Sequence, residues 1–202
     1  MRSKSVVSFL LLAVSMAGVG WGRSIVSNPQ VMVLVFDRSG ISPTVLLEAE
    51  RQAAKTFRRA DIDVTWLNCS AAPDEGNEPC QEVQRPNQFV LNIVNRSKQP
   101  TNDIFGIAFL GEDGSGNYVD IFLDQITRFR NESGTKESDL LAAVSAHEIG
   151  HLLLGLHSHS PWGVMSPRWE GAHLRSIAMG TLSFTPEQVS IMRTRIASMQ
   201  LE

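Results

Sequence analysis

The sequence predicts an α+β domain in which a mixed, twisted β-sheet carries a backing helix, a central helix and a C-terminal helix. Three observations predict it: apolar runs of strand length recur, helical periodicity appears between and after them, and the order of strand, helix and then several strands favours a mixed sheet with a helix on one face. The chain has 202 residues, a length that suits one well-buried domain better than two.

Five segments are predicted to be strands. The first, VMVLVF, is apolar and β-branched throughout, which predicts a strand buried on both faces. The second alternates apolar and polar residues, as a half-buried strand does. The five predicted strands are residues 31–36, 62–67, 89–94, 104–110 and 118–123.

Three further segments carry helical signals. The first begins at Ser42-Pro43, because serine suits the N-cap and proline the first turn. The second spans about 138–154, with Ser138 as the expected N-cap and an apolar face along its length. The third begins in the sequence TPEQ, residues 185–188, and ends near the C-terminus.

Composition and charge exclude several classes of protein. Apolar residues make up 43% of the chain and the net charge is −3, which excludes disorder as the main state. The sequence pI near 6.0 leaves no basic excess to neutralise phosphates, so no nucleic-acid partner is expected. Only one apolar run approaches the length of a membrane span, which excludes a multi-pass membrane protein.

Residues 1–22 have the pattern of a secretory signal peptide. Two basic residues precede a short apolar run, and small residues follow it. The predicted domain is therefore 23–202, and we expect it to be secreted or periplasmic, with no membrane association after signal cleavage. An uncleaved N-terminal anchor is the alternative.

Cys69 and Cys80 flank a loop rich in Pro, Gly and Asn. In an oxidising compartment such a pair is expected to form a disulfide. Two unpaired loop thiols are the alternative.

The sequence HEIGH, residues 147–151, lies in the second predicted helix. Residues four apart lie above one another on a helix, so His147 and His151 can direct two imidazoles at one metal ion. Glu148 lies beside the same face and can act as the base for a metal-bound water. Zinc in hydrolytic sites takes three protein ligands and keeps one position open. Two surface histidines on a helix are the alternative explanation.

The longer run HEIGHLLLGLHSHSPWGVMSP, residues 147–167, resembles the metzincin metallopeptidases, especially the matrixin-like members. Their pattern is HExxHxxGxxH followed by a methionine-containing turn. The resemblance implies zinc bound by His147, His151 and His157, with Glu148 as general base. It also implies Met165 as an apolar floor beneath the metal, a metzincin-like fold, and the strand at 104–110 as the place where an extended substrate is held.

One departure from the family pattern affects the third ligand. The family glycine is Leu154 here, and Gly155 follows it. A helix one residue longer would shift the chain beyond it, and His159 then becomes the alternative third ligand. Spacing favours His157.

Two carboxylates are weaker candidates for that third position. Glu170 lies in an irregular segment, and Glu187 lies in the first turn of the third predicted helix, where its charge favours the helix dipole. Of the nearby aromatic residues, Trp162 and Trp169 are expected to be core residues rather than pocket walls.

We therefore expect a secreted zinc metalloendopeptidase that hydrolyses peptide bonds with a zinc-activated water and Glu148 as general base. The expected cofactor is Zn²⁺, the expected partner is a peptide or protein substrate, and the expected state is a monomer. A non-catalytic, zinc-stabilised peptide-binding domain is the alternative function, and an exported interaction protein without metal is a third.

Overall fold

The computed structural model describes residues 28–69, 80, 85–95 and 104–200. The predicted signal peptide, residues 1–22, lies outside these described residues. Within them, no helix combines the length and the apolar character that a membrane span requires.

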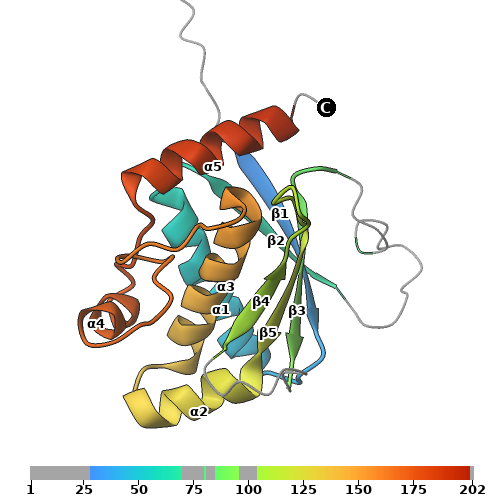
Figure 1. The fold of residues 1–202 in the computed structure, drawn as a ribbon. Coiled ribbons are helices and arrows are strands. Elements are labelled where there is room, and N and C mark those ends of the chain that lie inside the picture. The colour runs from blue at the N-terminus through green and yellow to red at the C-terminus, as the bar shows by residue number, and fades with distance from the viewer. Residues whose placement is uncertain (1–27, 70–79, 81–84, 96–103, 201–202) are drawn as a thin grey trace, which may run out of the picture.

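Five strands form one sheet in the order β2-β1-β3-β5-β4 (Figure 1). β1, β2, β3 and β5 run parallel, and β4 pairs antiparallel with β5 at one edge. This confirms the predicted mixed sheet, and each predicted strand agrees with an observed one to within two residues at either end. The strands are β1 (Gln30–Asp37), β2 (Asp63–Cys69), β3 (Gln88–Val94), β4 (Gly106–Phe109) and β5 (Tyr118–Phe122).

The three predicted helices are present as α1 (Pro43–Arg58), α3 (Glu137–Leu154) and α5 (Pro186–Met199). α1 and α3 pack against each other on one face of the sheet, and α5 crosses one end of this layer (Figure 1). The N-cap of α5 is Thr185, which forms a capping box with Gln188 as the TPEQ sequence predicts. The N-cap of α3 is Lys136, so the prediction of Ser138 at that position is wrong.

Two helices are additional to the predicted ones. α2 (Leu123–Ser133) begins directly where β5 ends and lies at the end of the molecule opposite α5 (Figure 1). α4 (Ala172–Ala178) is a short helix in the segment between α3 and α5.

The two faces of the sheet are covered in different ways. Alternate residues of the strands, such as Val33 and Ile93, join the main core with the helices. On the other face, Leu34 and Val90 form a small cluster with Cys69. β1 is therefore buried on both faces, as its continuously apolar sequence predicts. The disulfide between Cys69 and Cys80, also predicted, covers this second face.

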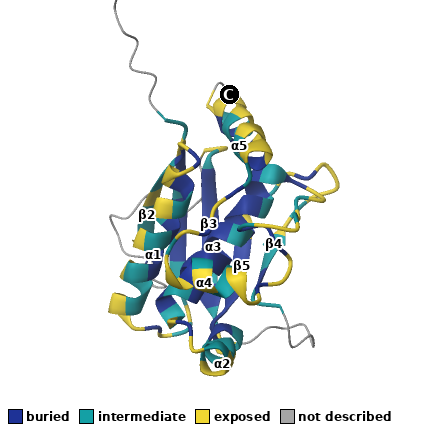
Figure 2. Cartoon of the chain, turned by 90° about the vertical axis from the view of Figure 1, so that its left-hand side faces the viewer, coloured by how far each residue is buried: buried dark blue, intermediate teal, exposed yellow. Residues whose placement is uncertain are grey.

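α3 is the central element of the domain (Figure 2). It contacts α1, α2, α4, α5, β4 and β5, and it is buried on nearly every side, as a helix that is apolar all round must be. A helix held on all sides is a rigid support, and the residues 147–151 lie in its second half.

Candidate metal centre

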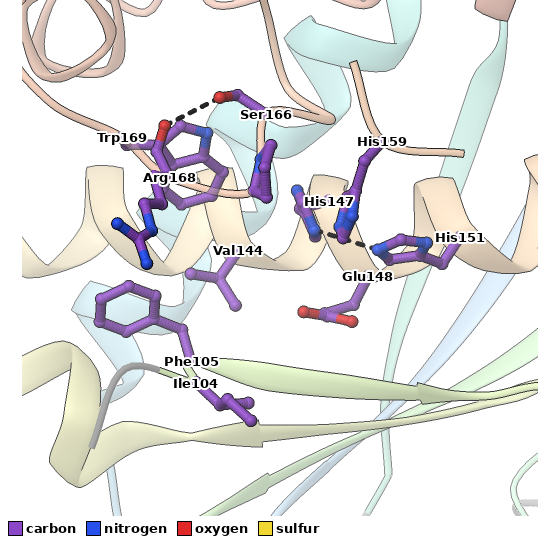
Figure 3. Close-up of a pocket in the computed structure, with 11 residues that line it drawn as sticks. Ile104, Phe105, Val144, His147, Glu148, His151, His159, Ser166, Arg168 and Trp169 are labelled. Atoms are coloured by element: carbon purple, nitrogen blue, oxygen red, sulfur yellow. Dashed lines mark hydrogen bonds between the residues drawn. The ribbon is translucent and has the colours of Figure 1, made fainter. Parts of the chain in front are cut away.

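Three histidines converge beside α3 (Figure 3). His147 and His151 come from successive turns of the helix, and His159 comes from the loop that follows it. One ring nitrogen from each lies within 4.8 Å of the other two. The Nε2 atoms of His147 and His151 are 3.1 Å apart. Two nitrogens bound tetrahedrally to one zinc ion stand about 3.3 Å apart, so this spacing fits a shared ion.

The end of α3 determines which later histidine reaches this cluster. The helix continues to Leu154 and ends at Gly155, whose φ of 80° and ψ of −157° are accessible essentially only to glycine. His157 then adopts a positive φ of 58°; it lines a hollow beside the start of α5, which His159 also lines, but it does not line the cavity beside the other two histidines. The geometry therefore brings His159, the alternative candidate, into the cluster and leaves His157, which spacing favours, outside it.

The loop that carries His159 is held by α5. The side-chain amide of Gln188 donates to the carbonyl of Ser158 at 3.2 Å and to the hydroxyl of Ser160 at 3.0 Å. Gln188 is buried and also forms the α5 capping box. One residue thus joins the start of α5 to the residues on both sides of His159.

Hydrogen bonds orient the two helical imidazoles. His147 Nδ1 lies 2.8 Å from the carbonyl oxygen of Val164, which can only accept, so the proton is on Nδ1 and Nε2 presents its lone pair to the centre of the cluster, where it faces His151 Nε2. His151 Nδ1 lies 2.7 Å from the Ser158 hydroxyl. Both rings thus turn Nε2 toward the centre of the cluster, the arrangement in which histidines bind metal ions. No sequence pattern had indicated Val164 and Ser158 as partners of these histidines.

Burial keeps these imidazoles neutral. Desolvation lowers the pKa of His147 to about 4, and desolvation together with the two neighbouring histidines lowers the pKa of His151 to about 3. Neutral imidazole is the form that binds a metal ion. The donor set, its protonation and its orientation all fit zinc.

Glu148 lies beneath the histidines and is 7% exposed. Burial raises its pKa to about 8, and a hydrogen bond from the backbone N–H of Ala108 in β4 opposes this rise. β4 can approach because residue 106 is glycine: a Cβ there would lie 2.7 Å from Cγ of Glu148. The edge strand therefore positions this carboxyl group.

Met165 and Trp169 support the cluster from the segment after His159. Met165 is fully buried, and a Cβ on Gly150 would lie 2.5 Å from its sulfur. Trp169 is buried with its ring edge-on to that of His147 at a centroid distance of 5.6 Å. It belongs to the core, as predicted, but it also lines the cavity beside the histidines, which was not expected. Trp162 is 71% exposed, and the same prediction for it is wrong.

A cavity of about 200 Å³ adjoins the histidines (Figure 3). One wall is α3, the second is the segment leading into β4, and the third is the segment after Met165. The carboxylate candidates Glu170 and Glu187 belong neither to the histidine cluster nor to this cavity. Its lining residues are Ile104, Phe105, Val144, His147, Glu148, His151, His159, Ser166, Pro167, Arg168 and Trp169.

No protein-family model and no curated protein matches the chain. Among solved structures it is similar to archaemetzincin from Methanopyrus kandleri, with 14% identity and a TM-score of 0.55 over 84% of this chain and 97% of that one. It shares its fold with zinc peptidases. A zinc-dependent peptidase from Methanocorpusculum labreanum is 12% identical, with a TM-score of 0.52 over 79% of this chain and 99% of that one. Metalloproteinase-II from Bacteroides fragilis is 12% identical, with a TM-score of 0.51 over 84% of this chain and 54% of that one. These similarities confirm the predicted metzincin-like fold.

Proposed function

We propose that this protein is a zinc metallopeptidase in which His147, His151 and His159 bind the ion and Glu148 is the general base. The observation that carries the proposal is the convergence of three imidazoles beside a buried carboxyl group and an open cavity. The fold shared with zinc peptidases supports it. In this proposal Met165 has the part that the metzincin resemblance implies, an apolar floor beneath the metal.

The zinc ion and Glu148 have different roles in the proposed hydrolysis. A zinc ion held by the three histidines would supply a Lewis acid for the hydrolysis. Glu148 accepts the proton of the attacking water and delivers it to the amine that leaves. Glu148 must be ionised to accept this proton, and a zinc ion at the neighbouring histidines would lower its pKa from the value of about 8 that burial gives it in the metal-free protein.

The edge of the sheet offers a place for an extended substrate. β4 is the edge strand of the described sheet and pairs only with β5 there. An extended peptide can add to such an edge by backbone hydrogen bonds. The backbone of Ala108 reaches Glu148, so a peptide bound along β4 would pass beside the proposed base. This arrangement supports an endopeptidase acting on peptide or protein substrates.

The disulfide supports an oxidising location, where such bonds persist. We propose that residues 1–22 direct export and that the domain 23–202 acts as a monomer in the periplasm or the medium. Recovery of the mature protein from the culture medium or periplasm, with mass spectrometry of its N-terminus, tests this.

Glu148→Gln tests the catalytic role directly. We expect the zinc-loaded wild type to cleave an unstructured protein substrate, and Glu148→Gln to lose at least about 100-fold in kcat/KM, since general-base catalysis contributes on that order or more. Zinc content should stay at one per chain in both. A wild type that binds one zinc ion and cleaves nothing would contradict the proposal and favour the non-catalytic peptide-binding domain.

A further inference from the structure

Arg168 lies in the wall of the cavity beside the histidines. It follows Met165 by three residues, and its guanidinium extends toward Phe105 on the facing wall (Figure 3). The hydroxyl of the buried residue Ser166 donates to the backbone carbonyl of Arg168 at 2.8 Å. This hydrogen bond holds the backbone of Arg168 in place at the rim of the cavity.

The guanidinium has no acidic partner among the described residues. The ion pairs of this part of the chain use Arg51, Arg128, Arg130 and Arg193. Glu148 is the one acidic residue in the cavity lining, and it accepts a hydrogen bond from Ala108. Arg168 is exposed, so it can receive a group that enters the cavity.

The remaining walls are largely apolar. Phe105 and Val144 lie on one side, and Pro167 and Trp169 on the other. A cavity of about 200 Å³ with one cation at its rim complements a group that has an apolar stem and a carboxylate end. Guanidinium and carboxylate form paired, charge-assisted hydrogen bonds, which a neutral amide forms less strongly.

We propose that Arg168 makes this cavity select a carboxylate on the substrate. The carboxylate belongs either to an acidic side chain of the peptide or to its free C-terminus. The inference rests on the proposed function, because it treats the cavity as part of a peptide-binding site. It goes further by assigning the substrate chemistry and the residue that recognises it.

Binding to the zinc-loaded Glu148→Gln protein tests the selection without cleavage. The probes are hexapeptides in which a single glutamate is moved through an apolar sequence, each matched by the glutamine peptide. Each peptide is made with a free and with an amidated C-terminus. Isothermal titration should give a Kd about 10- to 100-fold lower for one carboxylate form than for its amide partner, and added salt should reduce this ratio.

Two variants in the Glu148→Gln background isolate Arg168. Arg168→Gln should bring the carboxylate-to-amide ratio close to one. Arg175→Gln removes the same charge from an exposed position on α4 that does not line the cavity, and it should leave the ratio unchanged. A Glu/Gln difference assigns the carboxylate to a side chain, and an acid/amide difference assigns it to the C-terminus.

Equal affinity for carboxylate and amide peptides would overturn the inference, as would a preference that survives Arg168→Gln. Cleavage by the wild type separates it from the proposed function. Peptides that bind with a carboxylate preference but are never cleaved would contradict the peptidase and retain the selection. Peptides that are cleaved without any preference would contradict the selection alone, and failure to bind any peptide would overturn both.

Discussion

A buried carboxyl group links the candidate site to the stability of the fold. Glu148 has two constraints at once: α3 and β4 enclose it, and a single backbone N–H, from Ala108, donates to it. Its pKa is raised from 4.5 to about 8 because burial disfavours the charged form. The unfolded chain releases this proton near pH 4.5, whereas the folded, metal-free protein keeps it until about pH 8.

The sign of the resulting pH dependence follows from linkage. Between pH 4.5 and about 8 the folded state holds one more proton at Glu148 than the unfolded state, so this residue costs progressively more stability as the pH rises. Glu148→Gln removes that cost. We expect the melting temperature of metal-free Glu148→Gln, measured relative to metal-free wild type, to increase from pH 5 to pH 8. A difference that is constant or falls over this range would contradict a buried, protonated carboxyl group.

At the scale of elements, the end of α3 determines which later histidine joins the candidate metal centre. Gly155 allows a turn that other residues strain to make, and a Cβ there would also lie 3.2 Å from Nη1 of Arg195 and 3.3 Å from the carbonyl of Gly114. The loop beyond it carries His159 back to α3. Gly155, which stands one position later than the glycine of the family pattern, is thus also the residue at which the chain turns after α3.

Gly155→Ala should therefore affect both stability and metal binding. We expect a loss of about 1–3 kcal/mol in the free energy of unfolding, from backbone strain, together with a weaker zinc affinity as His159 is displaced. The control is Gly134→Ala, at the end of α2, where φ is 69° and no atom would contact the new Cβ. It should cost about 1 kcal/mol or slightly more and leave zinc binding unchanged. Equal zinc affinity in both variants would refute the role of Gly155.

Sequence periodicity predicted the elements with strong apolar patterns and missed those without them. The five strands and α1, α3 and α5 each carry a clear signal. α2 was missed because its apolar positions, Leu123, Ile126 and Phe129, lie in a short, mostly polar segment that continues directly from β5. For α3 the pattern predicted one apolar face, whereas burial extends around the helix, since its small residues also pack.

The candidate site was predictable only in its helical part. The positions of His147, Glu148 and His151 follow from helix geometry alone. The choice between His157 and His159 depends on backbone conformation at Gly155 and His157, and residue spacing does not encode it. Gly106 and Ala108 were missed for a similar reason, because their contact with Glu148 joins elements far apart in sequence.

At the scale of the whole molecule, the disulfide and the metal centre occupy different regions of the sheet. Cys69 ends β2 at one edge, and Glu148 contacts β4 at the other. We expect the Cys69→Ser/Cys80→Ser double variant to lose about 2–3 kcal/mol in the free energy of unfolding, as for other loops of this length. Zinc content measured on the folded variant should remain one per chain. Loss of zinc at temperatures where the variant is folded would show that the two regions are coupled.

We propose that His159 supplies the third imidazole of the metal centre, and metal analysis of two single variants distinguishes it from His157. Zinc per chain is measured by mass spectrometry for His157→Ala and His159→Ala, after circular dichroism has shown that both variants are folded. We expect one zinc ion per chain in His157→Ala and at least a tenfold weaker zinc affinity in His159→Ala. Retention of zinc by His159→Ala with loss from His157→Ala would contradict it.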